Sequence, residues 1–281
     1  MGGFFGAVSA NDCVLVVFYG TDYHSHLGTR RGGMTSYSAE LGFQRNIHSI
    51  ENSPFRTKFE KDVEKMRGNI CIGCISDTDP QPIMVRSKLG LYAVCSIGII
   101  QNAKALSEEL LESGCANFET MSSGNINSGG LIGALIAQKP TFVEGIRYAQ
   151  SKIEGTMSLV IMTEDSIICA RDRAGKLPIL IGKRSDGYCF SFESFAYQKL
   201  GYETCHELKA GEITCLTKDG YEVLYEGTEE MKICTFLWTY YGYPTACYEG
   251  VNVEVMRTKN GEIMAENDMK NGKLPDVDYV C

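Results

Sequence analysis

The chain has 281 residues, of which 44% are hydrophobic and 22% charged, so it can bury one large core or two modest ones. Its formal net charge of -8 argues against a polynucleotide partner, because phosphate binding needs clustered Lys and Arg. No apolar run has the length of a membrane span, and the glycine-rich start lacks the basic flank of a secretion signal. We therefore expect a cytoplasmic protein with neither nucleic acid nor membrane as partner.

The first half of the chain mixes apolar strands with amphipathic helices. Phe55, Phe59 and Val63 recur at helical spacing behind Pro54, which stands at the first helical position, and Gly68 ends this helix. In chain order, the pattern predicts a strand at 13–19, this helix, strands at 70–75 and 91–100, and helices at 103–112, 131–138 and 141–153.

The second half changes to strands separated by turns. Asp186-Gly187 and Asp219-Gly220 are dipeptides that supply positive φ at low cost. The predicted strands lie at 158–163, 166–171, 178–183, 188–193, 211–216 and 221–225, which reads as a meander. Strands at both ends of the chain with helices between them predict an α+β domain of two packed sheets between helical layers.

The twelve cysteines lie mostly in apolar runs, where thiols behave as small buried hydrophobes rather than disulfide partners. The segment Cys71-Ile72-Gly73-Cys74 is a conceivable zinc site with Cys95 and Cys115. Residues three apart on a strand face opposite sides, however, so we favour buried thiols and expect no metal and no cofactor. Of the four histidines, the pair in His24-Ser25-His26 is expected in an exposed loop.

A series of short motifs recurs in a characteristic order along the chain. These motifs are Gly3, Phe5 and Gly6; Arg31-Gly32; Arg171-Asp172, Gly175 and Pro178; Glu193-Ser194; Ala210-Gly211-Glu212; and Cys234, Phe236, Tyr241 and Pro244. In this order and rough spacing, over about its first 257 residues, the chain resembles the glutaminase half of the amidophosphoribosyltransferase family, which is a class II glutamine amidotransferase with an N-terminal nucleophile. The resemblance implies a four-layer αββα sandwich of two mainly antiparallel sheets.

The resemblance also implies where catalytic residues should stand, and the chain departs from the family there. The nucleophile is normally a cysteine directly after the initiator methionine, and this chain has Gly2. The family's oxyanion hole combines an Asn side chain with the amide of the next Gly, and the matching residues are Ile97 and Gly98. Losing a covalent nucleophile costs on the order of a millionfold in turnover, and losing one oxyanion donor costs about 10²–10³.

The substrate-binding positions depart as well. Ser76 replaces the arginine that clamps the carboxylate of glutamine, and Asn127 aligns with the aspartate that binds its ammonium group. Arg31 and Gly32 remain where the family places a matching pair near the pocket, although a turn with a surface arginine would explain them equally well. We expect a degenerate active site with pocket remnants at Arg31, Gly32, Ser76 and Asn127.

Arg171-Asp172 is expected to be structural, as an ion pair that organises the turn before Pro178. The end of the chain, Leu274 to Cys281, resembles the first strand of a phosphoribosyltransferase domain. The expected domains are therefore 1–257, like a type 2 glutamine amidotransferase, and 258–281, the start of a truncated phosphoribosyltransferase-like domain. Without the rest of that domain we expect neither a phosphoribosyl diphosphate site nor an iron–sulfur cluster.

Two functions from different classes remain open. In the first, the chain is an inactive amidophosphoribosyltransferase-like pseudoenzyme of purine biosynthesis. It would be a homo-oligomer that serves as scaffold or regulatory module for a phosphoribosyltransferase domain of the same or a longer parent chain. In the second, it is an active glutamine amidotransferase that releases ammonia for phosphoribosylamine synthesis, or a thiol- or metal-dependent hydrolase in the same pocket. The resemblance implies that the segments of Cys74 and Cys95 border that pocket, which makes these two the candidate thiols.

Overall fold

The computed structural model describes residues 2–114, 118, 124, 126–273 and 278. Its contacts divide the chain into two compact units, 1–234 and 235–281. Within the described ranges, no helix has both the length and the apolar character needed to cross a membrane.

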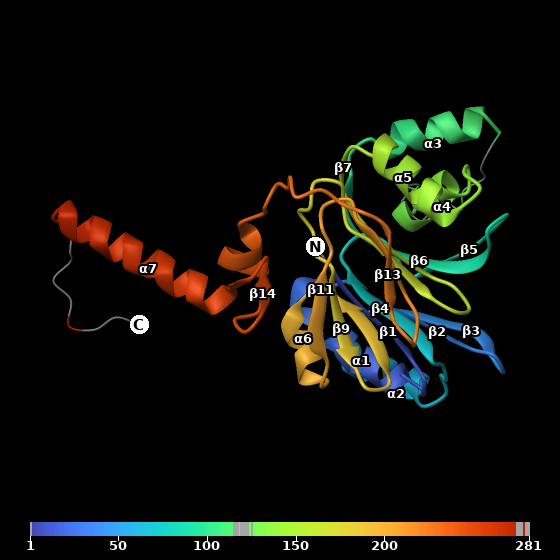
Figure 1. Cartoon of the computed structure of the whole chain (residues 1–281), viewed down its shortest axis with the longest axis horizontal. Coiled ribbons are helices and arrows are strands. Elements are labelled where there is room, and N and C mark those ends of the chain that lie inside the picture. The colour runs from blue at the N-terminus through green and yellow to red at the C-terminus, as the bar shows by residue number, and fades with distance from the viewer. Residues whose placement is uncertain (1, 115–117, 119–123, 125, 274–277, 279–281) are drawn as a thin grey trace. The chain divides into compact units, whose positions relative to one another are not determined.

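The first unit contains a seven-stranded antiparallel sheet, which we call sheet A (Figure 1). Its strand order is β11-β9-β10-β1-β4-β2-β3, so the first strand of the chain lies in the middle of the sheet. The strands are β1 (Gly2–Ser9), β2 (Arg31–Ser38), β3 (Gly42–Ser49), β4 (Ile70–Ser76), β9 (Leu180–Arg184), β10 (Gly187–Ser191) and β11 (Glu203–Glu207).

A six-stranded antiparallel sheet, sheet B, packs in the same unit, with the order β13-β12-β8-β7-β6-β5. Its strands are β5 (Ile83–Ser87), β6 (Gly90–Ile100), β7 (Gly155–Met162), β8 (Ile167–Ala170), β12 (Ile213–Leu216) and β13 (Tyr221–Tyr225). Consecutive chain segments thus enter different sheets, because β4 belongs to sheet A and β5 to sheet B.

Helices cover both outer faces, which confirms the predicted four-layer αββα sandwich (Figure 1). On sheet A lie α1 (Val14–Asp22), α2 (Phe55–Val63) and α6 (Ser194–Lys199), together with the short 3₁₀ helix η1 (Ser25–Leu27). On the side of sheet B lie α3 (Ala103–Glu112), α4 (Ser128–Ile136) and α5 (Phe142–Lys152).

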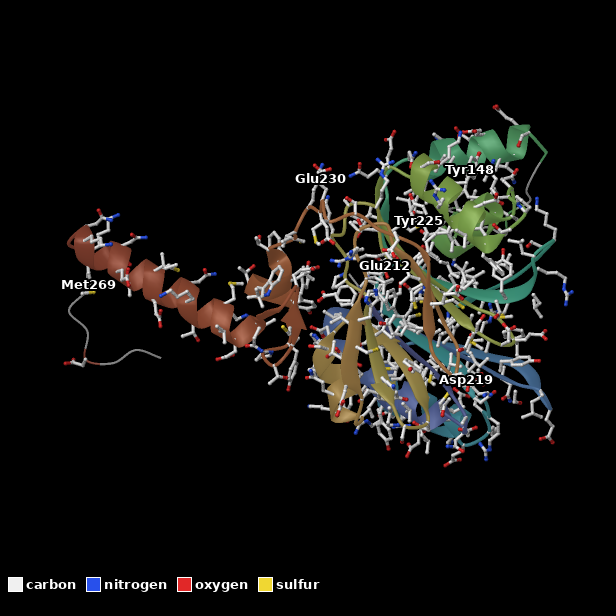
Figure 2. The ribbon with its side chains drawn as sticks, in the orientation of Figure 1. Tyr148, Glu212, Asp219, Tyr225, Glu230 and Met269 are labelled. Carbon is white, nitrogen blue, oxygen red and sulfur yellow. The ribbon has the colours of Figure 1, made fainter. Side chains whose placement is uncertain are left out.

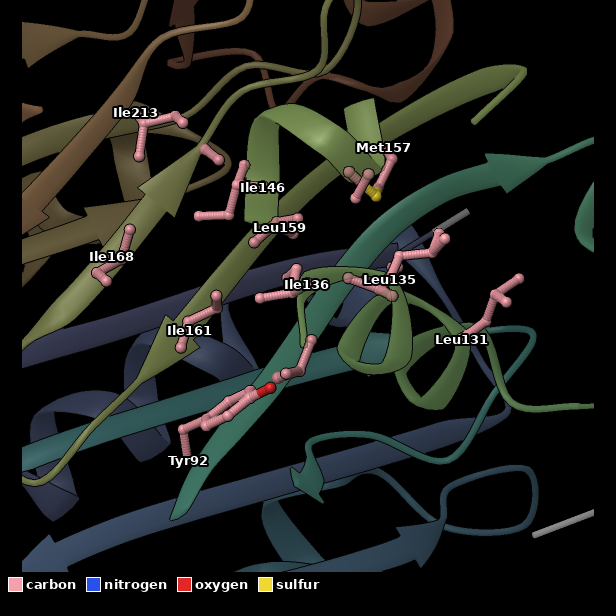
Figure 3. Packing of buried hydrophobic residues seen from close by; sticks show 14 of the residues in the cluster. Tyr92, Leu131, Leu135, Ile136, Ile146, Met157, Leu159, Ile161, Ile168 and Ile213 are labelled. Atoms are coloured by element: carbon pink, nitrogen blue, oxygen red, sulfur yellow. The ribbon is translucent and has the colours of Figure 1, made fainter. Parts of the chain in front are cut away.

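The outer face of sheet B buries a cluster of apolar side chains under these helices (Figure 3). Leu159, Ile161 and Tyr92 project from the strands toward Leu135 and Ile136 of α4. Because side chains alternate along a strand, the intervening residues of β6 face the other way, toward sheet A.

The predicted strand at 13–19 was wrong, since these residues begin helix α1. The run is apolar on consecutive positions, so periodicity alone cannot separate a buried strand from a buried helix. The signal for a helix start is Asp12, whose carboxylate accepts hydrogen bonds from the amides of Val14 and Gly68. Within the helix, the hydroxyl of Thr21 donates a hydrogen bond to the carbonyl of Val17.

The predicted meander was wrong in its connectivity. The strands themselves occur close to the predicted ranges, but β9 pairs with β10 and β10 pairs with β1 in sheet A, whereas β7, β8, β12 and β13 belong to sheet B. Turn residues fix which strands form local hairpins, but they do not fix which sheet a hairpin joins.

The second unit contains the π-helical turn η2 (Leu237–Tyr241), the short strands β14 (Cys247–Tyr248) and β15 (Val251–Asn252), and helix α7 (Val253–Lys270). Arg257 of α7 donates hydrogen bonds to the carbonyls of Trp238 and Gly242, 2.7 and 2.9 Å long. The strand expected in Leu274 to Cys281 lies outside the described residues, apart from Asp278.

Candidate functional site

The structure brings Gly2, Ser76 and Arg31 into one row across three strands. Gly2 is the ladder partner of Ser76 in the β1–β4 pair, and Ser76 is the partner of Arg31 in the β2–β4 pair. Direct partners in an antiparallel sheet share a face, so the three residues lie on the same face at one end of sheet A. This row gathers the positions that the resemblance assigns to the nucleophile, the carboxylate clamp and the nearby arginine.

Gly2 leaves no room for a side chain in the observed strand arrangement. A Cβ atom built on Gly2 would lie 2.5 Å from the carbonyl oxygen of Ile75 on β4, and this oxygen belongs to the backbone. Any larger residue at position 2 therefore requires β1 and β4 to shift relative to each other. Gly2 thus offers no reactive side-chain atom, and the observed strand arrangement leaves no space for one.

Ser76 is 6% exposed and is engaged with the backbone that follows it. Its hydroxyl accepts hydrogen bonds from the amides of Thr78 and Asp79, at 3.3 and 3.2 Å. A serine has neither the charge nor the reach of the arginine that the resemblance places there.

Asn127 is 8% exposed and is also engaged within the protein. Its Oδ1 caps helix α4 by accepting from the amide of Gly129 at 2.8 Å, and its Nδ2 donates to the carbonyl of Pro80 at 2.9 Å. Both ends of the amide thus hold α4 and the segment before β5.

Ile97 and Gly98 lie on β6 of sheet B, not in the row on sheet A. Ile97 is the ladder partner of Ser158 and is 5% exposed. Gly98 has φ +140, and a Cβ atom there would meet the carbonyl oxygen of Thr156, so only glycine fits without strain. An apolar side chain therefore stands at the position that the resemblance assigns to the oxyanion donor, next to the glycine amide.

Arg31 and Gly32 differ from each other in their surroundings. The side chain of Arg31 is exposed and makes no hydrogen bond or ion pair with any residue in the described part of the chain. Gly32 is buried, and a Cβ atom there would lie 2.6 Å from the ring of Phe55 on α2. Gly32 is thus required for packing of α2.

The two cysteines of the Cys71–Cys74 pair face opposite sides of β4, as strand geometry predicts. Hydrogen bonding to Cys74 and burial raise the pKa of Cys95 well above its usual value, and burial together with Cys13 does the same for Cys71. Cys74 therefore meets sheet B, and Cys71 meets the α1 side. Cys115 lies outside the described residues; among those that are described, no three His, Cys, Asp or Glu side chains converge as metal ligands.

His24 was wrongly expected to be exposed. It is completely buried beside Gly3 of β1, and burial lowers its pKa to about 4. Its Nδ1 lies 2.7 Å from the carbonyl of Gly20, and its Nε2 lies 3.2 Å from Oγ of Ser191. His26 lies 2.8 Å from the buried carboxylate of Glu193.

This polar cluster behind β1 was missed in the sequence. Its one local signal is the Glu193-Ser194 motif, which says nothing of a histidine about 170 positions earlier in the chain. Only the pairing of β1 with β10 brings Ser191 next to the His24 segment. The cluster supports the strand that begins at Gly2.

Arg171 and Asp172 organise a turn, and they do so through hydrogen bonds between their side chains and backbone groups. Arg171 is 1% exposed and donates to the carbonyls of Leu208 and Gly175. Asp172 accepts from the amides of Ala174 and Leu177. Both side chains thus satisfy backbone groups in a buried turn.

Comparison with known proteins gives the following similarities. Residues 66–198 match a family described as a glutamine amidotransferase domain. The chain is 25% identical over 260 residues to the amidophosphoribosyltransferase of Archaeoglobus fulgidus, covering 89% of this chain and 55% of that protein. It is 29% identical over 254 residues to the one of Staphylococcus epidermidis, covering 87% and 47%. The chain spans about half the length of the curated relatives it matches.

Among solved structures, the glutamine phosphoribosylpyrophosphate amidotransferase of B. subtilis complexed with ADP and GMP matches with a TM-score of 0.83. The match covers 94% of this chain and 58% of that chain at 23% identity, and it supports the fold alone. A glutamine aminotransferase class-II domain protein from Silicibacter pomeroyi matches with a TM-score of 0.55 and 10% identity.

Proposed function

We propose that this chain, which carries a class II glutamine amidotransferase domain homologous to the N-terminal domain of amidophosphoribosyltransferases, does not hydrolyse glutamine. The observation that carries the proposal is the position of Gly2. It has no side chain to attack an amide, and the carbonyl of Ile75 occupies the space that a side chain would need. An amidotransferase of this class uses a side-chain nucleophile at that position.

The remaining positions support the same conclusion. Ser76 supplies no cation for a substrate carboxylate, and Ile97 supplies no donor for an oxyanion. Substitution of Cys for Gly2 alone would leave both losses in place. A rescue by the nearby thiols is disfavoured because hydrogen bonding to Cys74 and burial raise the pKa of Cys95, so it stays protonated and poorly nucleophilic.

We further propose that the domain serves as a scaffold or regulatory module for a phosphoribosyltransferase domain, in purine nucleotide synthesis in the cytoplasm. The relatives are amidophosphoribosyltransferases about twice as long as the matched region, which supports a partner domain of that type. In this proposal residues 1–257 form the amidotransferase-like domain, residues 258–281 begin the transferase-like one, and the protein is a homo-oligomer.

The test is glutamate release by purified protein incubated with glutamine, with the amidophosphoribosyltransferase of B. subtilis as positive control. We expect no turnover from this chain and none from the Gly2→Cys variant. Turnover of about 1–10³ per second, the ordinary range for enzymes, would overturn the proposal. A covalent adduct formed by the unaltered chain with a glutamine-mimicking electrophile would overturn it too.

The scaffold role has a separate test in the complete product of the gene. If a transferase domain follows residue 281, we expect it to form phosphoribosylamine from free ammonia and not from glutamine. Deleting residues 1–257 should lower that ammonia-dependent rate. An unchanged rate after deletion, or equal use of glutamine, would contradict the role.

A further inference from the structure

We infer that residues 77–82, which connect β4 to β5, form a fixed strap that keeps the site end of the two sheets closed. The side chains at two positions that the resemblance assigns to the substrate, Ser76 and Asn127, anchor this strap. The functional importance of this strap rests on the proposed loss of glutaminase activity. Whether the strap is fixed can be tested without measuring that activity.

The strap crosses from one sheet to the other. It leaves sheet A at Ser76, directly beside Gly2, and enters sheet B at Ile83. Six extended residues reach at most about 20 Å and stacked sheets are about 10 Å apart, so the length of the connection does not fix it and its contacts must do so.

On sheet A, the strap is held at both of its ends. The hydroxyl of Ser76 accepts the amides of Thr78 and Asp79 at its start. At its end, the carbonyl of Gln81 lies against Gly33 of β2, where a Cβ atom would collide with it. This close approach is possible only because position 33 has no side chain.

On sheet B, the side chain of Gln81 takes the place of a missing backbone pair. Ile83 is the partner of Val94, so the same register continued would pair position 82 with 95 and position 81 with 96. Pro82 has no amide hydrogen to continue the ladder. Instead, Nε2 of Gln81 donates a hydrogen bond to the carbonyl of Ser96 at 3.1 Å, and Oε1 of Gln81 accepts one from the amide of Ser96 at 2.6 Å.

Helix α4 holds the middle of the strap. Nδ2 of Asn127 donates to the carbonyl of Pro80 at 2.9 Å, and the amide of Ser128 donates to Oδ2 of Asp79 at 3.1 Å. A carboxylate at this helix start also interacts favourably with the helix dipole. Asp79 and Gln81 are 5% and 3% exposed, so these hydrogen bonds are shielded from water.

The strap also engages the clamp position itself. The hydroxyl of Ser76, at the position where the family has a cation for the carboxylate of glutamine, accepts hydrogen bonds from the amides of Thr78 and Asp79. The strap thus opposes glutamine by position, independently of the missing nucleophile.

Hydrogen exchange of the full chain, followed by mass spectrometry with residue-level fragmentation, tests this inference. We expect the amides of Thr78 and Asp79 to be protected in the unaltered protein. In Ser76→Ala they should exchange about five- to tenfold faster, the effect of losing one hydrogen bond. The matched control is Ser87→Ala, because Ser87 accepts the amide of Leu89 in another turn and should leave the strap unchanged.

Strap amides that exchange at the rate of an unfolded peptide in the unaltered protein would overturn the inference, as would equal rates in Ser76→Ala and the unaltered protein. Asn127→Ala provides a second variant, expected to accelerate exchange at Asp79. If the protein releases glutamate while the strap amides are protected, the proposed loss of activity is refuted and the strap inference stands. If the strap amides are unprotected and no glutamate is released, the strap inference is refuted and the proposed loss of activity stands.

Discussion

Nε2 of His206 lies 2.6 Å from Oε1 of Glu212. This contact joins β11, the edge of sheet A, to the segment that enters β12 of sheet B, where Glu212 is labelled in Figure 2. The imidazole ring also stacks on Tyr221 of β13, with centroids 5.3 Å apart. Glu212 further accepts from Oγ1 of Thr214 and from the amide of Lys209. The two sheets are therefore fastened at one side by a buried carboxylate.

This fastening predicts a pH dependence of stability. Burial acts to raise the pKa of Glu212, but the hydrogen bonds from His206 and Thr214 outweigh burial and hold the pKa below its usual value. A carboxyl whose pKa is lower when folded stabilises the protein above its unfolded pKa, about 4.3, and loses that contribution as the pH falls through the folded pKa.

We expect Glu212→Gln to lower the free energy of unfolding at pH 7 by about 1–3 kcal/mol, the range for hydrogen bonds to charged groups. The difference from the unaltered protein should shrink below about pH 4.3. Urea unfolding at several pH values measures both effects, with Glu222→Gln on the exposed side of β13 as control. A deficit that is the same at pH 3.5 and pH 7 would argue against the carboxylate as its source.

Arg171 provides a second prediction, on the role of a motif that the resemblance shares. Replacing it by Met leaves the buried carbonyls of Leu208 and Gly175 unpaired, and each unpaired group costs about 1–3 kcal/mol. We expect Arg171→Met to lose about 2–4 kcal/mol of unfolding free energy. The exposed neighbour Arg173 is the matched control, and a similar loss in Arg173→Met would point to a general charge effect.

Replacement of two different glycines by alanine should change the stability of the protein in opposite directions. A methyl group on Gly33 would collide with the carbonyl of Gln81, so Gly33→Ala should cost about 1–3 kcal/mol. Gly130 lies in α4 with open space at its Cβ position, so Gly130→Ala should stabilise by about 0.5–1 kcal/mol. Thermal unfolding of the two variants beside the unaltered protein decides the signs, and a neutral Gly33→Ala would show that the strap yields easily.

Thiol labelling under native conditions checks the burial of the site cysteines. Cys74 and Cys95 are 2% and 0% exposed, whereas Cys205 is exposed. We expect an alkylating reagent to modify Cys205 in the folded protein and to reach Cys74 and Cys95 only after denaturation. Peptide mapping identifies the modified cysteines. Rapid labelling of Cys95 in the folded protein would support the alternative that the chain is a thiol-dependent hydrolase.

Local patterns predicted many elements well, because helical spacing in Phe55, Phe59 and Val63 and the apolar run from Ile70 to Ile75 are properties of neighbouring residues. The run at 13–19 failed because a helix buried on most sides has no polar face to reveal its period. Strands β2 and β3 were not anticipated, since their short polar and small residues give weak alternation.

The sequence by itself determined the family, the sandwich architecture and the absence of a reactive side chain at Gly2, since these depend on residue identities in order along the chain. Only the tertiary structure decided that β4 pairs with β1 on one side and with β2 on the other, which places Ser76 between Gly2 and Arg31. It also decided that Ser76 and Asn127 are engaged in holding residues 77–82. The physical reason is that ladder register and hydrogen bonds between distant segments depend on how whole sheets pack, which local sequence does not encode.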